Sequence, residues 1–274
     1  MDGMKSNPDF AAISAVLMEN LELSGSPVAV KIVTAPEQIP TGVPEIEETI
    51  RHCRMISLAR EGKVFYATDA KHQCNGGAWA LGLRAKGETL RSGEFYYKLG
   101  KYESLSSSRR TMDSVPSLPQ ETYATLYAPL EKAEFAPSVV LMFAKPKAML
   151  KLAQTVLYQL GGRIYPQFSG IQSVCSDATA HVLLSGKPNF SLGCDGSRRF
   201  SGIADEEMVV GFPVEMIEEI AKHLSTVVNA AGSKNNSFFD SWQREVSVIA
   251  ANERCVFSSS AACCSVRSDD CPVS

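Results

Sequence analysis

The chain has 274 residues, of which 45% are hydrophobic, and its formal net charge is −3 at pH 7. This length can bury a large core, in one sizeable domain or in two fused smaller ones. Lys and Arg are scattered rather than striped, which argues against a nucleic-acid-binding surface.

No stretch of the sequence resembles a signal peptide or a membrane span. The N-terminus lacks a basic segment followed by an apolar one, and the longest apolar run, 139–144, is too short to cross a bilayer. We therefore expect a soluble, cytoplasmic protein that is not inserted in a membrane.

The first part of the chain alternates helical and strand patterns. Apolar residues at helical spacing predict a helix over 8–21, and the apolar run 28–33 predicts a buried strand. A helix over 45–60 would turn Cys53 inward, and a strand is expected at 63–68. The glycines after Cys74 predict a helix start, where backbone N–H groups near the sulfur would stabilise a thiolate.

The remainder of the chain begins with a polar insertion, 84–122, which has no counterpart later and is expected to carry the specific function. Further elements are predicted from periodicity and turn residues. They are strands at 123–127, 138–144, 181–185 and 208–212, a helix beginning at Pro129, and helices over 147–160 and 213–228. The Ser-rich tail from Ser258 is expected to be disordered.

Two cysteine pairs echo each other along the chain. Cys53 and Cys74 are spaced almost as Cys175 and Cys194 are, and similar strand patterns precede the two pairs. We therefore expect an α/β or α+β fold with an internally duplicated, pseudo-two-fold architecture. The expected boundaries are 1–26 for an N-terminal helix, 27–135 for the first half with its insertion, 136–231 for the second half, and 232–274 for a partly disordered C-terminal extension.

Eight cysteines in a reducing compartment favour metal or redox chemistry over disulfides. Cys53, Cys74, Cys175 and Cys194 suit an iron–sulfur cluster, of the 4Fe–4S type, because each iron of a cubane takes one thiolate. A tetrahedral zinc site would use the same ligands. The spacing differs from C-x-x-C motifs, so four small buried hydrophobic residues are the plain alternative.

Arg198 and Arg199 follow Cys194 and would offset the negative charge of a cluster. The turn glycines Gly76 and Gly196 complete the predicted cofactor-binding set. The same arginines, with the insertion, could instead hold an anionic small molecule. His52 and His72 adjoin the first cysteine pair as further ligand candidates, although core histidines are the commoner case.

The segments Pro27-Val-Ala-Val-Lys, Cys53-Arg-Met-Ile-Ser-Leu-Ala-Arg-Glu-Gly, Cys74-Asn-Gly-Gly, Cys175-Ser-Asp and Cys194-Asp-Gly-Ser-Arg stand in an order that resembles the archaeal and bacterial "domain of unknown function 169" family. The resemblance covers about 15–228. It implies a prokaryotic cytosolic setting and places the four paired cysteines within the family pattern. It leaves the tail cysteines, Cys255, Cys263, Cys264 and Cys271, outside that pattern.

The sequence thus favours an iron–sulfur protein acting in electron transfer or redox-linked chemistry of anaerobic metabolism. The alternative is a binding module for an anionic ligand with structural cysteines. A redox partner protein, an anionic small molecule and a homo-oligomer are all compatible with this interpretation, whereas nucleic acid is not expected.

Overall fold

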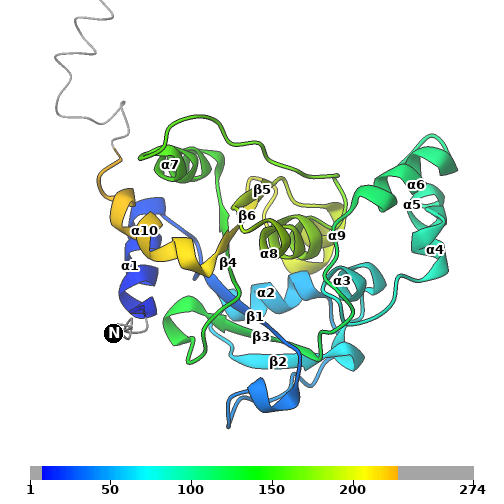
Figure 1. Ribbon diagram of the computed structural model, residues 1–274, viewed down its shortest axis with the longest axis horizontal. Helices are drawn as coiled ribbons and strands as arrows, with labels where there is room; N and C mark the ends of the chain where they lie inside the picture. The colour runs from blue at the N-terminus through cyan, green and yellow to red at the C-terminus, as the bar shows by residue number, and fades with distance from the viewer. Residues whose placement is uncertain (1–7, 228–274) are drawn as a thin grey trace, which may run out of the picture. The chain divides into compact units, whose positions relative to one another are not determined.

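One six-stranded antiparallel sheet runs through residues 8–227, the part of the chain that this computed structural model describes (Figure 1). Its strands are β1 (Val28–Val33), β2 (Phe65–Thr68), β3 (Ala124–Pro129), β4 (Val139–Ala144), β5 (Asn189–Ser191) and β6 (Met208–Pro213). The longer helices are α1 (Phe10–Leu21), α2 (His52–Arg60), α6 (Leu105–Ser114), α7 (Pro146–Leu157) and α10 (Val214–Leu224). The fold is therefore mixed α/β.

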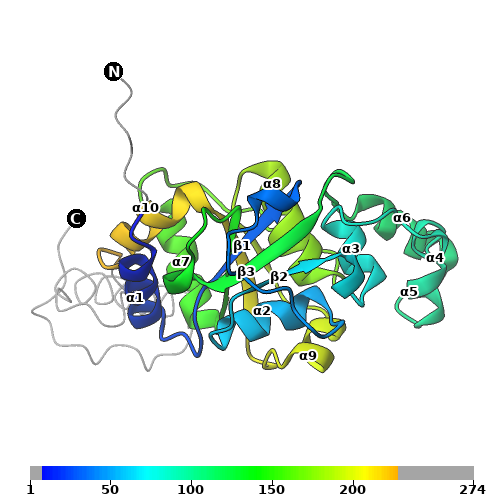
Figure 2. The same ribbon diagram turned by 90° about the horizontal axis from the view of Figure 1, so that it is seen from below.

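Shorter helical segments connect these elements. They are η1 (Pro36–Gln38), η2 (Asp69–Lys71), α3 (Asn75–Ala80), α4 (Glu88–Arg91), α5 (Glu94–Lys98), η3 (Leu130–Lys132), η4 (Ser173–Ala180), α8 (His181–Ser185) and α9 (Asp195–Ser201). Helices α1, α7 and α10 cover one face of the sheet, and α2, α3, α8 and α9 lie on the other (Figure 2).

The sheet has a hydrophobic core on each face, and the two central strands, β1 and β4, contribute side chains to both. In β4, Val140 and Met142 face the α1–α7–α10 layer, whereas Val139 and Leu141 face the layer that contains α2 and η4. All six residues of β4 are buried, because side chains alternate between two covered faces. Burial on both faces explains why β1 and β4 read as continuous apolar runs in the sequence.

The strand order is β2-β3-β1-β4-β6-β5. From the centre outwards, one side of the sheet contains β1, β3 and β2, and the other side contains β4, β6 and β5, so the two sides follow the same order. The registers match as well. Between β1 and β4, Val28 pairs with Leu141 and Val30 pairs with Val139. If Val28 corresponds to Val139 and Val30 to Leu141, exchanging the two strands turns the first pair into the second. Pairs from Val28–Pro129 to Val33–Ala124 correspond to pairs from Val139–Pro213 to Ala144–Met208.

The segment that contains Cys175 is helical throughout, so the predicted strand at 181–185 is wrong. Residues 173–180 form a π-helix that continues directly into α8, and Gly186 ends α8 with a left-handed φ of 63°. A short apolar run such as Val182-Leu183-Leu184 fits a strand or a buried helix equally well. The π-helix lies so close to β6 that a β-carbon on Gly211 would be 1.9 Å from the Ala178 carbonyl oxygen.

Two further boundaries differ from expectation. The helix predicted over 45–60 begins only at His52, because Glu45 and Ile50 make isolated bridges to Tyr66 and His72. At Pro129 only the three-residue η3 follows, whereas α10 follows Pro213 over eleven residues.

The insertion 84–122 folds into α4, α5 and α6, which stand together at the end of the domain away from α1 and α10 (Figure 1). They share a small core with α3, built on Trp79, Leu90, Met112, Val115 and Ile171. Within 8–227, no helix is long and apolar enough to cross a membrane. The four tail cysteines lie outside the described residues.

Candidate functional site

All four cysteines of the two pairs line one cavity of about 430 Å³ on the α2–η4 side of the sheet. Each is a free, partly buried thiol. Cys53 comes from α2 and Cys74 from the start of α3, while Cys175 comes from the π-helix and Cys194 from the start of α9. The two halves of the sequence therefore contribute two thiols each to the same space.

Each cysteine stands at the first turn of a helix. Cys74 and Cys194 are the N-cap residues of α3 and α9, and the Gly77 N–H donates to Cys74 Sγ at 3.4 Å. Cys53 is the second residue of α2 and Cys175 the third of the π-helix. First-turn N–H groups lack partners within their helix and favour negative charge nearby. These N–H groups would offset part of the cost of a thiolate at the cavity wall.

Two of these thiols resist ionisation. Burial raises the pKa of Cys53 to about 11. Burial also raises the pKa of Cys175 well above its usual value, and the neighbouring Cys74 and Cys194 raise it further. Both thiols therefore keep their protons at pH 7.

A buried polar network backs the cavity on the sheet side. Tyr127 Oη lies 2.8 Å from His52 Nδ1 and 2.8 Å from Thr125 Oγ1, and Thr125 Oγ1 lies 3.1 Å from His72 Nε2. Burial lowers the pKa of His52 well below its usual value and that of His72 to about 3, so both imidazoles are neutral at pH 7. Of the two, only His52 reaches the cavity wall.

The mouth of the cavity is aromatic and cationic. Phe95, Leu99 and Phe200 line it and are each close to half exposed or more. The Arg51 guanidinium carbon lies 3.7 Å from the centre of the Phe200 ring, and that of Arg199 lies 5.5 Å from it. Lys101 also lines the cavity but is ion-paired with Asp195.

Comparison with known proteins places the chain in a family. The model of the DUF169 family, described as "Uncharacterised ArCR", matches residues 16–223. The chain belongs to the DUF169 family. An uncharacterised protein of Methanocaldococcus jannaschii is 44% identical over 208 residues, which cover 75% of this chain and 89% of that protein. No solved structure matches.

The other predicted residues of this DUF169 chain occupy different places. Arg199 and Gly196 line the cavity. Arg198 does not, because its guanidinium donates to the carbonyl oxygens of Leu192, Ala204 and Glu207 and so braces the loops around α9. Gly76 lies behind the wall, where a β-carbon would be 2.8 Å from Gln172 Nε2.

Several cavity residues of the DUF169 chain were missed by sequence reasoning. Arg51 lies two residues before Cys53 but outside any recognised motif, and Tyr96 and Gln172 come from the insertion and from the segment before the π-helix. Gln172 has a left-handed φ of 53°, which is uncommon for a residue other than glycine. Composition of the insertion, with its interspersed tyrosines, was the one available indication for Tyr96.

The described residues contain no group of three or more His, Cys, Asp or Glu side chains gathered closely enough to hold a single metal ion. The four thiols are instead distributed around the cavity wall. Asp177, a buried carboxyl near Cys175, is turned to Ser191, whose Oγ donates to it at 2.8 Å. Burial raises the pKa of Asp177 to about 7.

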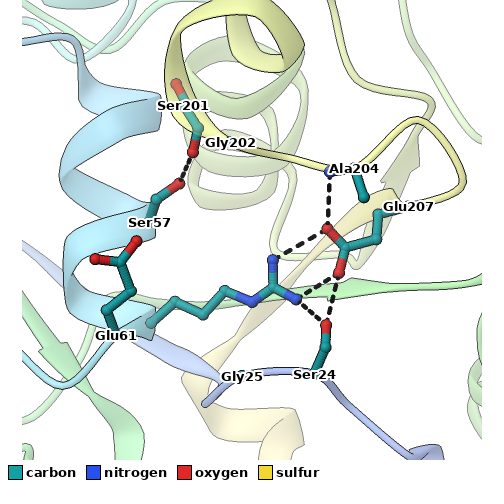
Figure 3. A pocket seen from close by; sticks show the side chains of 9 residues that line it. Ser24, Gly25, Ser57, Glu61, Ser201, Gly202, Ala204 and Glu207 are labelled. Atoms are coloured by element: carbon teal, nitrogen blue, oxygen red, sulfur yellow. Dashed lines mark hydrogen bonds and ion pairs between the residues drawn. The ribbon is translucent and has the colours of Figure 1, made fainter.

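A second hollow, of about 330 Å³, lies between the chain before β1 and the loop after α9 (Figure 3). Its charged groups satisfy each other: Arg60 pairs with Glu207, which also accepts from Ser24 Oγ at 2.9 Å and from the Ala204 N–H at 3.2 Å. This ion pair ties three segments together. The charges of Arg60 and Glu207 in this hollow are therefore already paired with each other.

Proposed function

We propose that the DUF169 chain binds an iron–sulfur cluster, of the 4Fe–4S type, through Cys53, Cys74, Cys175 and Cys194, and acts in electron transfer or redox-linked chemistry. The observation that carries this proposal is that four free thiols, two from each half, line one cavity. A cubane needs one thiolate at each of four irons and accepts ligands from separated segments.

The size of the cavity favours a cluster over zinc. A structural zinc ion holds its thiolates at about 2.3 Å and needs no cavity around it. Here the thiols stand around a space of about 430 Å³. Such a space suits a polynuclear cluster bridged by inorganic sulfide better than it suits one ion.

Charge around the cavity supports the same assignment. A cubane with four thiolates carries net negative charge, which nearby cations and helix N-termini stabilise. Arg51 and Arg199 line the cavity, and all four cysteines stand in first helical turns. Cluster binding would also displace the thiol protons of Cys53 and Cys175, because the ligand is the thiolate.

An internal duplication is part of the proposal. Exchange of β1 with β4 and of β3 with β6 reproduces the registers of the central ladders, and Phe65–Tyr127 then corresponds to Asn189–Gly211 in the outer ladders. Cys53 and Cys175 each lie in a helix that comes between the first and second strands of their half, α2 in the first half and the π-helix in the second. We infer that a duplicated unit contributed one pair of ligands from each copy.

The proposed setting is a reducing cytoplasm, because cluster ligation needs reduced thiols. Electron transfer requires a redox partner protein, and the exposed Phe95, Leu99 and Phe200 at the mouth would shorten the path between the cluster and such a partner.

Single replacements by Ser test the ligand set. Cys53→Ser, Cys74→Ser, Cys175→Ser and Cys194→Ser should each remove most of the iron from anaerobically purified protein, whereas Cys263→Ser, in the tail, should leave it unchanged. Retention of full iron in two or more of the four variants would refute the assignment.

A further inference from the structure

The cysteines line only part of the cavity wall. The outer part is lined by arginine and apolar side chains. We infer that this outer part binds a small organic anion with an apolar body, whose carboxylate or phosphate group contacts Arg51 and Arg199 and whose hydrogen-bond donor reaches Gln172. The inference rests on the proposed function in one respect: a cluster bound to the four cysteines would form the inner end of the ligand site.

Arg51 and Arg199 are the cations available to a ligand. Within 8–227 both guanidinium groups lie against the Phe200 ring, and neither forms an ion pair with a carboxylate. By contrast, Lys101 forms an ion pair with Asp195, and the Arg198 guanidinium donates hydrogen bonds to backbone carbonyl oxygens. A guanidinium presents five N–H donors in a planar fork that matches carboxylate and phosphate oxygens. Two such forks beside one ring form an anion site.

Gln172 supplies an acceptor deeper in the cavity. Gln172 lines the cavity although the residue is only 5% exposed, and its Oε1, itself buried, has no hydrogen-bond partner among the described residues. A buried acceptor without a partner is unfavourable, because it has lost its hydrogen bonds to water. The Tyr96 hydroxyl lies nearby, since a β-carbon built on Gly76 would be 3.7 Å from it and 2.8 Å from Gln172 Nε2. A ligand hydroxyl or amine would satisfy the free oxygen.

The apolar body is expected from the rest of the lining. Phe95 and Leu99 of the insertion face the same space as Ile171 and Phe200. Small-molecule sites are mostly apolar with a few placed polar groups, as this outer part of the wall is. Since the insertion contributes Phe95, Tyr96 and Leu99, it would determine which body fits.

Isothermal titration calorimetry on the anaerobically purified full-length protein tests the inference. The probes are phenylacetate and phenyl phosphate, which combine the two features, with inorganic phosphate and 2-phenylethanol as probes for each feature alone. We expect at least one of the two combined probes to bind at least tenfold more tightly than either single-feature probe. Which of the two binds more tightly distinguishes a carboxylate ligand from a phosphate ligand.

Two variants and a matched control complete the experiment. The double variant Arg51→Gln/Arg199→Gln should weaken binding of the combined probe at least tenfold, and Gln172→Leu should weaken binding only of probes that carry a donor, such as 4-hydroxyphenylacetate. Arg110→Gln, an exposed arginine on α6 outside the cavity, should leave binding unchanged.

Absence of binding by both combined probes, equal binding of 2-phenylethanol, or an unchanged affinity in the double variant would overturn the inference. Iron and sulfide are measured on the same samples. An iron-free protein that still binds the probes would contradict the proposed cluster and not the anion site, whereas an iron-loaded protein that binds none would contradict the anion site alone.

Discussion

Gly77 of α3 faces the sulfur of Cys175 on the π-helix. A β-carbon built on Gly77 would lie 3.8 Å from Cys175 Sγ and 3.7 Å from Cys74 Cβ. Both distances are ordinary van der Waals contacts, so the metal-free fold has room for a methyl group. That methyl group would, however, stand between two of the proposed ligands.

Gly77→Ala is therefore predicted to lower cluster binding without lowering the stability of the metal-free protein. Alanine in a helix is favoured over glycine by roughly 1 kcal/mol, so the metal-free protein should unfold at the same or a higher denaturant concentration. The iron content should fall to less than half of the wild-type value, because the methyl group occupies cluster space. Gly87→Ala is the matched control, since nothing lies within 4 Å of its added β-carbon. Full iron in Gly77→Ala would contradict the proposed position of the cluster.

The adjacent arginines Arg198 and Arg199 are predicted to behave differently. Arg198→Ala leaves three carbonyl oxygens around α9 without their charged donor, and hydrogen bonds to charged groups contribute about 1.5–3 kcal/mol each. The free energy of unfolding should fall by about 2 kcal/mol or more in urea titrations. Arg199→Ala, at an exposed position, should change it by less than about 0.5 kcal/mol. Equal effects would show that Arg198 does not brace the loop.

Tyr127→Phe tests the polar network behind the cavity. Loss of the hydroxyl leaves His52 Nδ1 without its partner at 2.8 Å in a fully buried position. The free energy of unfolding should decrease by about 1–3 kcal/mol. Tyr123→Phe, with its ring 42% exposed just before the same strand, should change it by less than about 0.5 kcal/mol. Denaturant unfolding at pH 7 measures both, and a neutral Tyr127→Phe would argue against the network.

The stability of the metal-free protein should fall at high pH because of Cys53. The folded-state pKa of this thiol is about 11 against an ordinary value of 9.0, so the folded state holds the proton more tightly than the unfolded state. That contribution is complete below about pH 9 and is lost as the pH rises through 11. One pKa unit corresponds to about 1.4 kcal/mol. Between pH 8 and pH 11 the free energy of unfolding of Cys53→Ala should therefore fall by about 2 kcal/mol less than that of the wild type. Parallel pH profiles of the two chelator-treated proteins would contradict this.

Local patterns were sufficient to predict much of the secondary structure. The apolar runs of β1 and β4, bounded by prolines or polar turns, are buried strands, and the helical spacing of Ile13, Leu17 and Leu21 corresponds to α1. The π-helix at 173–180 was missed because its i→i+5 pattern leaves no 3.6-residue periodicity in the sequence.

The site itself depends on distant segments. The paired cysteines could be singled out from their spacing, because their recurrence is a property of the sequence alone. Arg51, Tyr96 and Gln172 could not, since only the folded chain brings α2, α5 and the segment before the π-helix to one cavity. Conversely, Arg198 resembled Arg199 in the sequence, and only the carbonyl oxygens around it distinguish the two roles.

Iron and acid-labile sulfide analysis of the full-length protein, purified without oxygen, tests the central claim most directly. The account predicts about four iron and four sulfide per chain, together with broad absorbance near 400 nm from thiolate-to-iron charge transfer. Both should disappear in Cys175→Ser. A colourless protein that contains zinc, or no metal, after anaerobic purification and after reconstitution with iron and sulfide, would contradict the account.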